Sequence, residues 1–338
     1  MTRESPAKCR CKGIAQIGIV VDDVELVARN YWDILGIGPW TVLDFEAPFA
    51  YDCKYQGKSV WTRERIAVAR AGNVELELAQ PVDGPSVFRD WIQQHGEGLH
   101  HLNFLVEDFD RDYAALAGDG FPCIESGRFV GPGAVENRNA HFDVKPLRAI
   151  VEPVLLEAAP NMNERTVPAA GATSPAKVQC TGITQLGIVV RDVELVAKNY
   201  WDILGIGPWA VFDWEPPLVY DRTYRGGGVW TRERIAVAQA GSLRLQLLQP
   251  VDGPSIYADW LEEHGEGLHH LSFLVDDIDG VSAALANDGF PCIQSGRFAA
   301  PEGRESRFAY HDTKPLRAII EPVYLEGEPD GEVCLVPS

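Results

Sequence analysis

The amino-acid sequence repeats itself over most of its length. When the numbering is shifted by 169 positions, residues 30–40 and 199–209 share the sequence NYWDILGIGPW, and residues 95–102 and 264–271 share HGEGLHHL. A repeat of this size is a duplicated domain, because solenoid units have periods of only about 20–50 residues. We therefore expect two copies of one domain, each with the same fold.

The duplication also sets the expected domain boundaries. The first copy is predicted over residues 1–157 and the second over residues 178–327. Residues 158–177 are rich in Ala, Pro, Ser and Thr and lack apolar periodicity, so we expect a linker there. Residues 328–338 are predicted to form an acidic tail. Each copy is long enough to bury a sizeable core of its own.

The charge of the chain excludes several classes of partner. The formal net charge is −19, which argues against binding to nucleic acid or to an anionic membrane surface. No apolar run reaches the roughly 18 residues of a membrane span, and residues 1–12 lack the apolar core of a signal peptide. We therefore expect a cytoplasmic protein. Its seven cysteines are an odd number, so they cannot all pair within one chain.

Within each copy, the sequence predicts the order strand, helix, strand, strand, strand, and then the same order again. The first strand is expected at residues 14–21, and the first helix follows a cap at Asp22 or Asp23 and stops at Gly36. The remaining strands are expected at residues 40–45, 61–70, 74–80, 99–106, 122–126, 136–142 and 147–156, with helices at 87–94 and 109–117. Four such modules make an α+β protein.

Two segments carry a resemblance to a known superfamily. Residues 16–40 read QIGIVVDDVELVARNYWDILGIGPW, and residues 74–110 read VELELAQPVDGPSVFRDWIQQHGEGLHHLNFLVEDFD. They resemble methylmalonyl-CoA epimerases and other members of the vicinal-oxygen-chelate superfamily, which includes glyoxalases and extradiol dioxygenases. The resemblance covers nearly all of both copies. It implies two tandem glyoxalase-like domains, each of two βαβββ modules that form a cup-shaped mixed sheet around a metal.

The resemblance also implies a set of metal ligands, one on each of four strands. In this sequence the matching positions are Gln16, Glu77, His101 and Glu152 in the first copy, and Gln185, Gln246, His270 and Glu321 in the second. Two carboxylates and one imidazole suit a divalent ion of intermediate hardness, and zinc, nickel, cobalt, manganese and iron all remain open. The second set has only one carboxylate, so we expect it to bind metal less tightly.

The first-strand position departs from the pattern of the epimerases, which usually have His where this chain has Gln16 and Gln185. The set Gln, Glu, His, Glu resembles that of the eukaryotic type of glyoxalase I. His100 and His101 are neighbours in a predicted strand and are expected to point to opposite faces, so only His101 is assigned as a ligand. Glu157 is a rival to Glu152 on the same segment.

Three further polar residues of the first copy are candidates for substrate binding. Arg63, Arg128 and Tyr51 all recur at the matching positions of the second copy. A buried arginine binds a carboxylate or phosphate well. The alternative is that these side chains form ion pairs at the surface or between domains.

The leading functional hypothesis is a metal-dependent isomerase, epimerase or lyase that acts on a small oxygenated metabolite. In this hypothesis the substrate chelates the metal through two oxygens, and the metal stabilises an enolate. Glu152 or Glu77 is the expected catalytic base.

Two alternatives come from the same superfamily. An extradiol-type ring-cleaving dioxygenase needs two His and one carboxylate around iron. Gln16 and Gln185 count against it, although His95 or His141 would change this if either approached the site. The other alternative is a binding protein without enzymatic activity. Four modules complete two cups within one chain, so both a monomer and a homodimer are compatible with the sequence.

Overall fold

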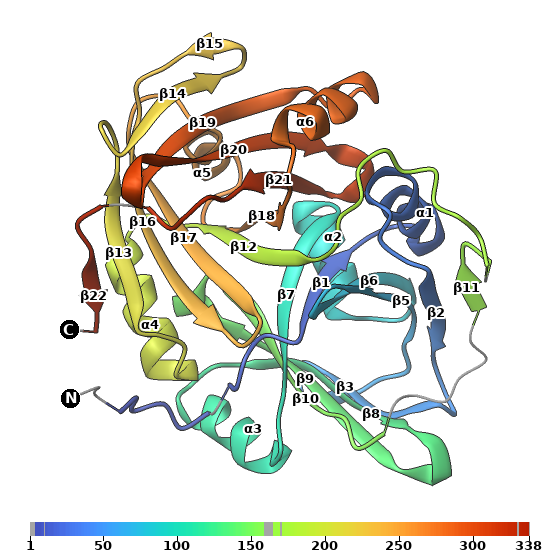
Figure 1. The fold of residues 1–338 in the computed structure, drawn as a ribbon. Coiled ribbons are helices and arrows are strands. Elements are labelled where there is room, and N and C mark those ends of the chain that lie inside the picture. Colours follow the sequence, from blue (N-terminus) through green and yellow to red (C-terminus); the bar gives the residue numbers. More distant parts are fainter. Residues whose placement is uncertain (1–3, 10, 159–164, 170, 330, 338) are drawn as a thin grey trace.

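The chain forms two mixed β-sheets of 11 strands each, with six α-helices among the residues described. The computed structural model describes residues 4–9, 11–158, 165–169, 171–329 and 331–337. Each half of the chain supplies one sheet, and the two sheets lie against each other (Figure 1). This arrangement agrees with the predicted α+β class and with two domains in tandem.

The first half contains eleven strands and three helices. They are β1 (Gln16–Val20), α1 (Val24–Leu35), β2 (Trp40–Phe45), β3 (Ala50–Tyr55), β4 (Lys58–Ser59), β5 (Arg63–Ala71), β6 (Val74–Asp83), α2 (Val87–His95), β7 (Gly98–Leu105), α3 (Phe109–Gly118), β8 (Cys123–Val130), β9 (Glu136–Val144), β10 (Ala149–Leu155) and β11 (Arg165–Val167).

The second half repeats this order. Its elements are β12 (Ile183–Val189), α4 (Val193–Leu204), β13 (Trp209–Trp214), β14 (Val219–Tyr224), β15 (Gly227–Gly228), β16 (Arg232–Ala240), β17 (Leu243–Asp252), α5 (Ile256–Glu263), β18 (Gly267–Leu274), α6 (Ile278–Asn287), β19 (Cys292–Ala300), β20 (Arg304–Thr313), β21 (Ala318–Tyr324) and β22 (Cys334–Val336). Among the helices described, none is both long and apolar enough to cross a membrane.

Helix α1 shows why these elements form where they do. The Asp23 carboxylate accepts hydrogen bonds from the backbone N–H groups of Glu25 and Leu26, which have no partner within the helix. At the other end, Gly36 adopts a left-handed conformation with φ of 71°, which costs glycine little. The helix buries one apolar face against its sheet. Both ends agree with the sequence prediction.

The strand order of the first sheet brings the two modules of a copy together at its centre. The order is β11-β2-β5-β6-β1-β7-β10-β9-β8-β3-β4. The first strands of the two modules, β1 and β7, pair antiparallel, while β1 runs parallel to β6 and β7 runs parallel to β10. The four central strands β6, β1, β7 and β10 are the ones on which the sequence placed the expected ligands.

The structure contains strands that the sequence analysis did not predict. The hairpin β3–β4 extends the sheet beyond β8. Strand β11 lies in the segment predicted as a linker, where it pairs with the edge strand β2, and β22 in the predicted tail pairs with β13 in the same way. Both added strands have only three residues, too few to show an alternating pattern. They cover sheet edges that would otherwise be open.

The two copies exchange their leading segments. The segment before β1 packs on the second copy, where Ser5 donates to the Trp201 carbonyl and the Ile14 N–H donates to the Ala240 carbonyl. The segment before β12 packs on the first copy in the same manner, since Ser174 donates to the Trp32 carbonyl. Figure 1 shows the N-terminal segment running beside α4. We call residues 5–9, 11–14 and 174–183 the exchanged arms.

Candidate metal centre

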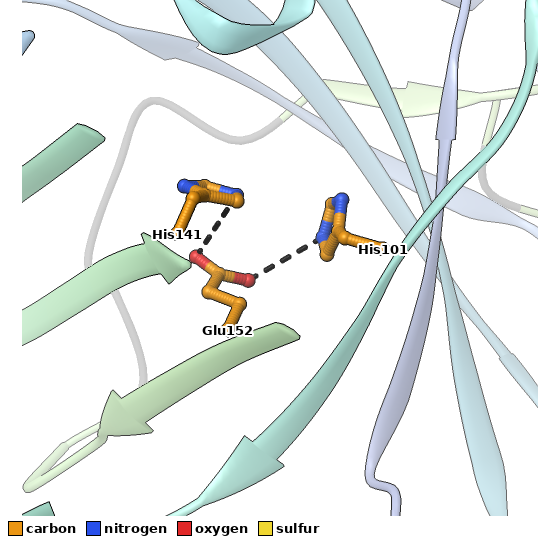
Figure 2. Close-up of side chains that lie close together, drawn as sticks. All are labelled: His101, His141 and Glu152. Atoms are coloured by element: carbon orange, nitrogen blue, oxygen red, sulfur yellow. Dashed lines mark ion pairs between the residues drawn. The ribbon is translucent and has the colours of Figure 1, made fainter. Parts of the chain in front are cut away.

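Three side chains that are suitable as metal ligands meet in the first copy (Figure 2). They are His101 on β7, His141 on β9 and Glu152 on β10, and all three are buried. The Nε2 atom of His101 lies 3.4 Å from Oε2 of Glu152, and Nε2 of His141 lies 3.6 Å from Oε1 of Glu152. Their ligand atoms all lie within 4.8 Å of one another. We call these three residues the metal trio.

The register of the strands explains this meeting. Strands β9 and β10 pair so that Val151 faces Phe142 and Val154 faces Asn139, which sets Glu152 opposite His141. Side chains that face each other across neighbouring strands share one side of the sheet. His141 therefore belongs to the site although no motif marks it. The sequence analysis had named it only as a residue that would matter if it approached.

A fourth candidate, Glu77 on β6, also approaches Nε2 of His101. Its Oε1 atom is 3.6 Å from Nε2 of His101. Three of the four predicted first-copy ligands, Glu77, His101 and Glu152, are thus brought together. The side chain of Gln16 is engaged by a different carboxylate, since its Nε2 donates to Oε1 of Glu75 at 2.7 Å.

The prediction that His100 and His101 point to opposite faces is wrong. Strand β7 contains a bulge, because Gly18 faces His101 while the next residue of β1, Ile19, faces Leu99. His100 is the extra residue, and a bulge re-aims side chains away from strict alternation. The Nδ1 atoms of the two rings lie 2.9 Å apart, so one donates to the other. This bond leaves Nε2 of His101 as the atom that faces the carboxylates.

The electrostatics separate the two carboxylates. Burial alone would raise the pKa of Glu152, but His141, His101 and Asn139 outweigh it and hold that pKa at about 2. Burial raises the pKa of Glu77 to about 8, against the opposing effect of His101. Glu152 is therefore ionised at neutral pH without help from a metal. Asn103 and Asn139 also donate hydrogen bonds to its two oxygens, at 2.9 and 3.1 Å.

The trio has the chemistry that a divalent cation requires. Burial lowers the pKa of His141 to about 4, so this ring is neutral. Neither of its ring nitrogens has a hydrogen-bond partner among the described residues. A buried polar atom without a partner is costly, and a metal ion would satisfy it. Two imidazoles and a carboxylate suit zinc, iron, cobalt, nickel and manganese.

Comparison with known families agrees with the fold. Residues 15–141 and 184–310 match the model of the Glyoxalase/Bleomycin resistance protein/Dioxygenase superfamily. The chain belongs to this superfamily. It is also 28% identical over 150 residues to the uncharacterized protein YqjC of Bacillus subtilis (strain 168). That match spans 44% of this chain and 94% of YqjC.

Two solved structures share the tandem arrangement of this superfamily member. A mutant of 4-hydroxymandelate synthase from Streptomyces coelicolor aligns over 97% of this chain and 95% of its own, with a TM-score of 0.61 and 17% identity. A xylose isomerase-like TIM barrel/4-hydroxyphenylpyruvate dioxygenase fusion protein aligns over 97% of this chain and 51% of its own, with a TM-score of 0.50 and 14% identity. At such identities the likeness concerns the fold alone.

The second copy has different side chains at the positions that form the site in the first copy. Tyr310 stands where the first copy has His141, so one imidazole is missing. His270 keeps its place, with Nε2 3.4 Å from Oε2 of Glu321. Gln185 donates to the side-chain oxygen of Gln246 at 3.0 Å, so these two predicted ligands bind each other. Among the described residues, the second copy contains no group like the metal trio.

The interior of the second cup is also packed with aromatic rings. Tyr257 donates to the Tyr310 hydroxyl at 2.6 Å, and Phe308 lies against Tyr310 with ring centroids 5.8 Å apart. A buried ion pair between Arg222 and Glu233 occupies the position of Cys53 and Glu64 in the first copy. The second cup is thus filled by aromatic rings and a buried ion pair, whereas the first cup contains the metal trio.

The three predicted substrate-binding residues are engaged with acidic neighbours. Tyr51 donates to Oε2 of Glu136 at 2.9 Å, and Arg128 donates to both oxygens of the same carboxylate at 2.7 and 2.8 Å. Nε of Arg63 lies 3.2 Å from Oε2 of Glu46. Among the described residues, no hydrogen bond or ion pair joins them to the metal trio. Their contacts match the alternative of surface ion pairs.

Two other residues raised by the sequence lie outside the trio. His95 stacks on Trp91 at the end of α2, with ring centroids 4.3 Å apart, and is exposed. Glu157, the rival of Glu152, is exposed beyond the end of β10.

Sequence reasoning missed a buried pair of carboxyl groups in the first cup. Glu64 and Glu125 are 4% and 8% exposed, and Glu125 accepts a hydrogen bond from the Val87 N–H at 2.6 Å. Burial raises the pKa of both groups, to about 7 for Glu125. Two buried carboxyl groups this close favour a state in which one stays protonated. The sequence signal available was the replacement of Glu125 by Gln294 in the second copy.

Proposed function

We propose that the first copy is a metal-dependent enzyme that removes a proton from the carbon next to a metal-chelated carbonyl, as isomerases, epimerases and lyases do. The observation that carries this proposal is the position of Glu77. It stands beside His101 but outside the metal trio, so the site has a second carboxylate that the metal does not require. A proton transfer needs such a group.

The metal trio would hold the ion in this proposal. His101, His141 and Glu152 supply three donors, which leaves positions for two adjacent oxygens of a substrate. When bound, the ion would act as a Lewis acid that polarises the carbonyl. This role fits small oxygenated metabolites that chelate through neighbouring oxygens.

The chain's own residues would then position and move the proton. Glu77 would accept it in its ionised form, which the charge of a bound cation would favour over the protonated form that burial favours. Its carboxylate lies 3.6 Å from Nε2 of His101. Asn103 and Asn139 keep the Glu152 carboxylate fixed through their hydrogen bonds, and His100 fixes the ring of His101. Burial of the trio keeps bulk water away from the reacting carbon.

The test combines metal content with proton exchange. Full-length protein is incubated in deuterated water with 2-oxo acids, 2-hydroxy acids and acyl-CoA thioesters, and loss of the alpha proton is followed by NMR. Glu77→Gln should retain metal but lose roughly 100-fold or more of the exchange rate. Glu75→Gln is the matched control, since it changes a carboxylate two residues away on the same strand.

Two outcomes would contradict the proposal. If the wild-type protein binds metal but exchanges no alpha proton with any of these compounds, proton abstraction is the wrong reaction. If purified protein binds no divalent metal at all, the role of a binding protein without metal becomes the better account.

A second candidate function is favoured by one specific observation. His141 gives the first cup two imidazoles and one carboxylate, the ligand set of non-haem iron oxygenases, although Gln16 replaces the first-strand histidine. We therefore propose an extradiol-type dioxygenase as the alternative. An oxygen electrode with anaerobically iron-loaded protein and catechols decides between the two. Rapid oxygen uptake with a ring-cleaved product would establish the alternative, and its absence together with proton exchange would exclude it.

A further inference from the structure

A large cavity lies between the two copies, apart from the metal trio. Its volume is about 1150 Å³, and both halves of the chain line it. The first copy contributes α2 and the beginnings of β7 and β10, and the second contributes the matching parts of α5, β18 and β21. Neither Glu77 nor any member of the trio lines this cavity. It therefore forms a separate space with approximate two-fold symmetry.

One buried histidine from each copy lines this cavity. His100 and His269 both line it, and each is only 1% exposed. The Nδ1 atom of each ring is already paired with the next histidine in the chain, at 2.9 Å in both copies. The Nε2 atom of each has no hydrogen-bond partner among the described residues. Two buried polar atoms are thus left for a molecule in the cavity to bind.

The walls of the cavity are suited to an aromatic ring. Trp91 and Trp260 line it from α2 and α5, and each lies edge-on to the buried histidine of its own copy, with ring centroids 4.9 Å apart. The Nε1 atom of Trp260 is buried and has no hydrogen-bond partner in the part of the chain described. Ile150 and Ile319 add apolar surface at matching positions. Aromatic and apolar side chains of this kind commonly line small-molecule sites.

The charges around the cavity favour a neutral ligand. Seven carboxylates but only five lysine and arginine side chains line it. Two of these arginines are held in ion pairs between the copies, Arg148 with Glu266 at 2.9 Å and Arg317 with Glu97 at 2.8 Å. The other three also lie near carboxylates, Arg225 at 2.6 Å from Asp259, and Lys145 and Lys314 at 4.0 Å from Asp143 and Asp312.

We propose that the cavity between the copies is a second small-molecule site, which takes a flat aromatic compound with a neutral hydroxyl group. The ring would lie against Trp91 and Trp260, and the hydroxyl would pair with Nε2 of His100 or His269. A hydroxyl both donates and accepts, so it matches either tautomer of an imidazole. This site does not depend on the metal or on the reaction proposed for the first cup.

The test uses 2-naphthol as the probe and the full-length protein after removal of metal with a chelator. Isothermal titration should give saturable binding of one molecule per chain. His269→Phe and Trp260→Leu each remove a polar atom of the cavity from the copy without the metal trio, and each should weaken binding about tenfold or more. Trp230→Leu is the matched control, because Trp230 is 53% exposed and does not line the cavity.

Several results would overturn the proposal. One is the absence of saturable binding up to about 1 mM 2-naphthol, which is on the order of the weakest affinity that would matter. Another is an equal loss of affinity in Trp230→Leu. A third is unchanged affinity in both cavity variants. Tighter binding of 2-naphthoate than of 2-naphthol would overturn the assignment of a neutral ligand. If His269→Phe fails to fold, His269→Asn takes its place beside Trp260→Leu. Because metal is absent throughout, these results are independent of the function proposed for the first cup.

Discussion

The imidazole ring of His101 lies directly over the Cα atom of Gly18 on the neighbouring strand. A Cβ atom at position 18 would lie 1.9 Å from Cε1 of the ring and 2.4 Å from its Nε2. The backbone conformation of Gly18 does not demand glycine, since it is an ordinary strand residue. Space alone therefore requires glycine here. The second copy repeats the contact between Gly187 and His270.

Replacement of this glycine should displace the ligand. In Gly18→Ala the added methyl group pushes the His101 ring away from Glu77 and Glu152, and we expect metal affinity to fall roughly tenfold or more. Elemental analysis after dialysis against graded metal concentrations measures the change. Gly187→Ala is the control, because the second cup lacks the trio. Equal loss of metal in the two variants would contradict the assignment of the site to the first copy.

The two copies should differ in metal occupancy. His101→Ala removes a member of the trio, whereas His270→Ala removes a histidine whose cup has Tyr310 and Gln246 in place of ligands. We expect the first variant to lose most of its bound divalent ion and the second to keep it. Metal content per chain, measured by elemental analysis, checks this. A wild-type content of two ions per chain would be the contrary result.

His141 offers a sharper test, because the second copy shows which residue replaces it. In His141→Tyr the ring gains the hydroxyl found at Tyr310 and loses both imidazole nitrogens. We expect metal affinity to fall by about 100-fold while the fold is kept, since a tyrosine is already accommodated at this place in the other cup. Titration calorimetry measures the affinity, and circular dichroism checks the fold. Undiminished affinity would exclude His141 from the ligand set.

The carboxyl pair in the first cup predicts an unusual dependence of stability on pH. Burial raises the pKa of Glu125 from its ordinary 4.5 to about 7. The native state thus binds this proton more tightly than the unfolded state. The contribution of protonated Glu125 to the free energy of unfolding is fully present below pH 4.5. It is lost as the pH rises through 7 and stays lost at higher pH. Metal-free protein should therefore be less stable at pH 8 than at pH 5 on account of this group.

Glu125→Gln isolates the effect. Gln294 at the matching position already accepts the Ile256 N–H at 3.1 Å, as Glu125 accepts that of Val87, so the substitution preserves the hydrogen bond. We expect the variant to gain roughly 1–3 kcal/mol in free energy of unfolding at pH 8 and little at pH 4. Denaturant unfolding at the two pH values in the presence of a chelator measures this. The same gain at both pH values would show that ionisation is not the cause.

The sequence was sufficient for the fold because its signals are local and occur twice. The cap at Asp23 and the stop at Gly36 act within a few residues of each helix end, so sequence positions alone reveal them. The three-residue strand β11 has no such signal, since its formation depends on the open edge of β2. Short segments are stabilised by their partners, and the partner is distant in sequence.

The site was predicted in part for a related reason. Glu77, His101 and Glu152 were assigned from the resemblance to the superfamily, and the structure brings them together. The approach of His141 to Glu152 depends on the pairing of β9 with β10, and the turn of His100 depends on a bulge in β7. Residue alternation reveals neither the register of two strands nor a bulge. The sequence therefore did not show that His141 joins the site or that His100 pairs with His101.

The exchanged arms make the two halves interdependent. Each copy is completed by a segment that precedes the other copy, so a polypeptide with a single copy would achieve the same packing only by pairing with a second molecule. Joining the halves in one chain replaces that bimolecular step with an intramolecular one, whose effective concentration for a flexible connection is in the millimolar range. The assembly then survives dilution. It also places two cups of different sequence in every molecule, a combination that self-association of identical subunits never produces.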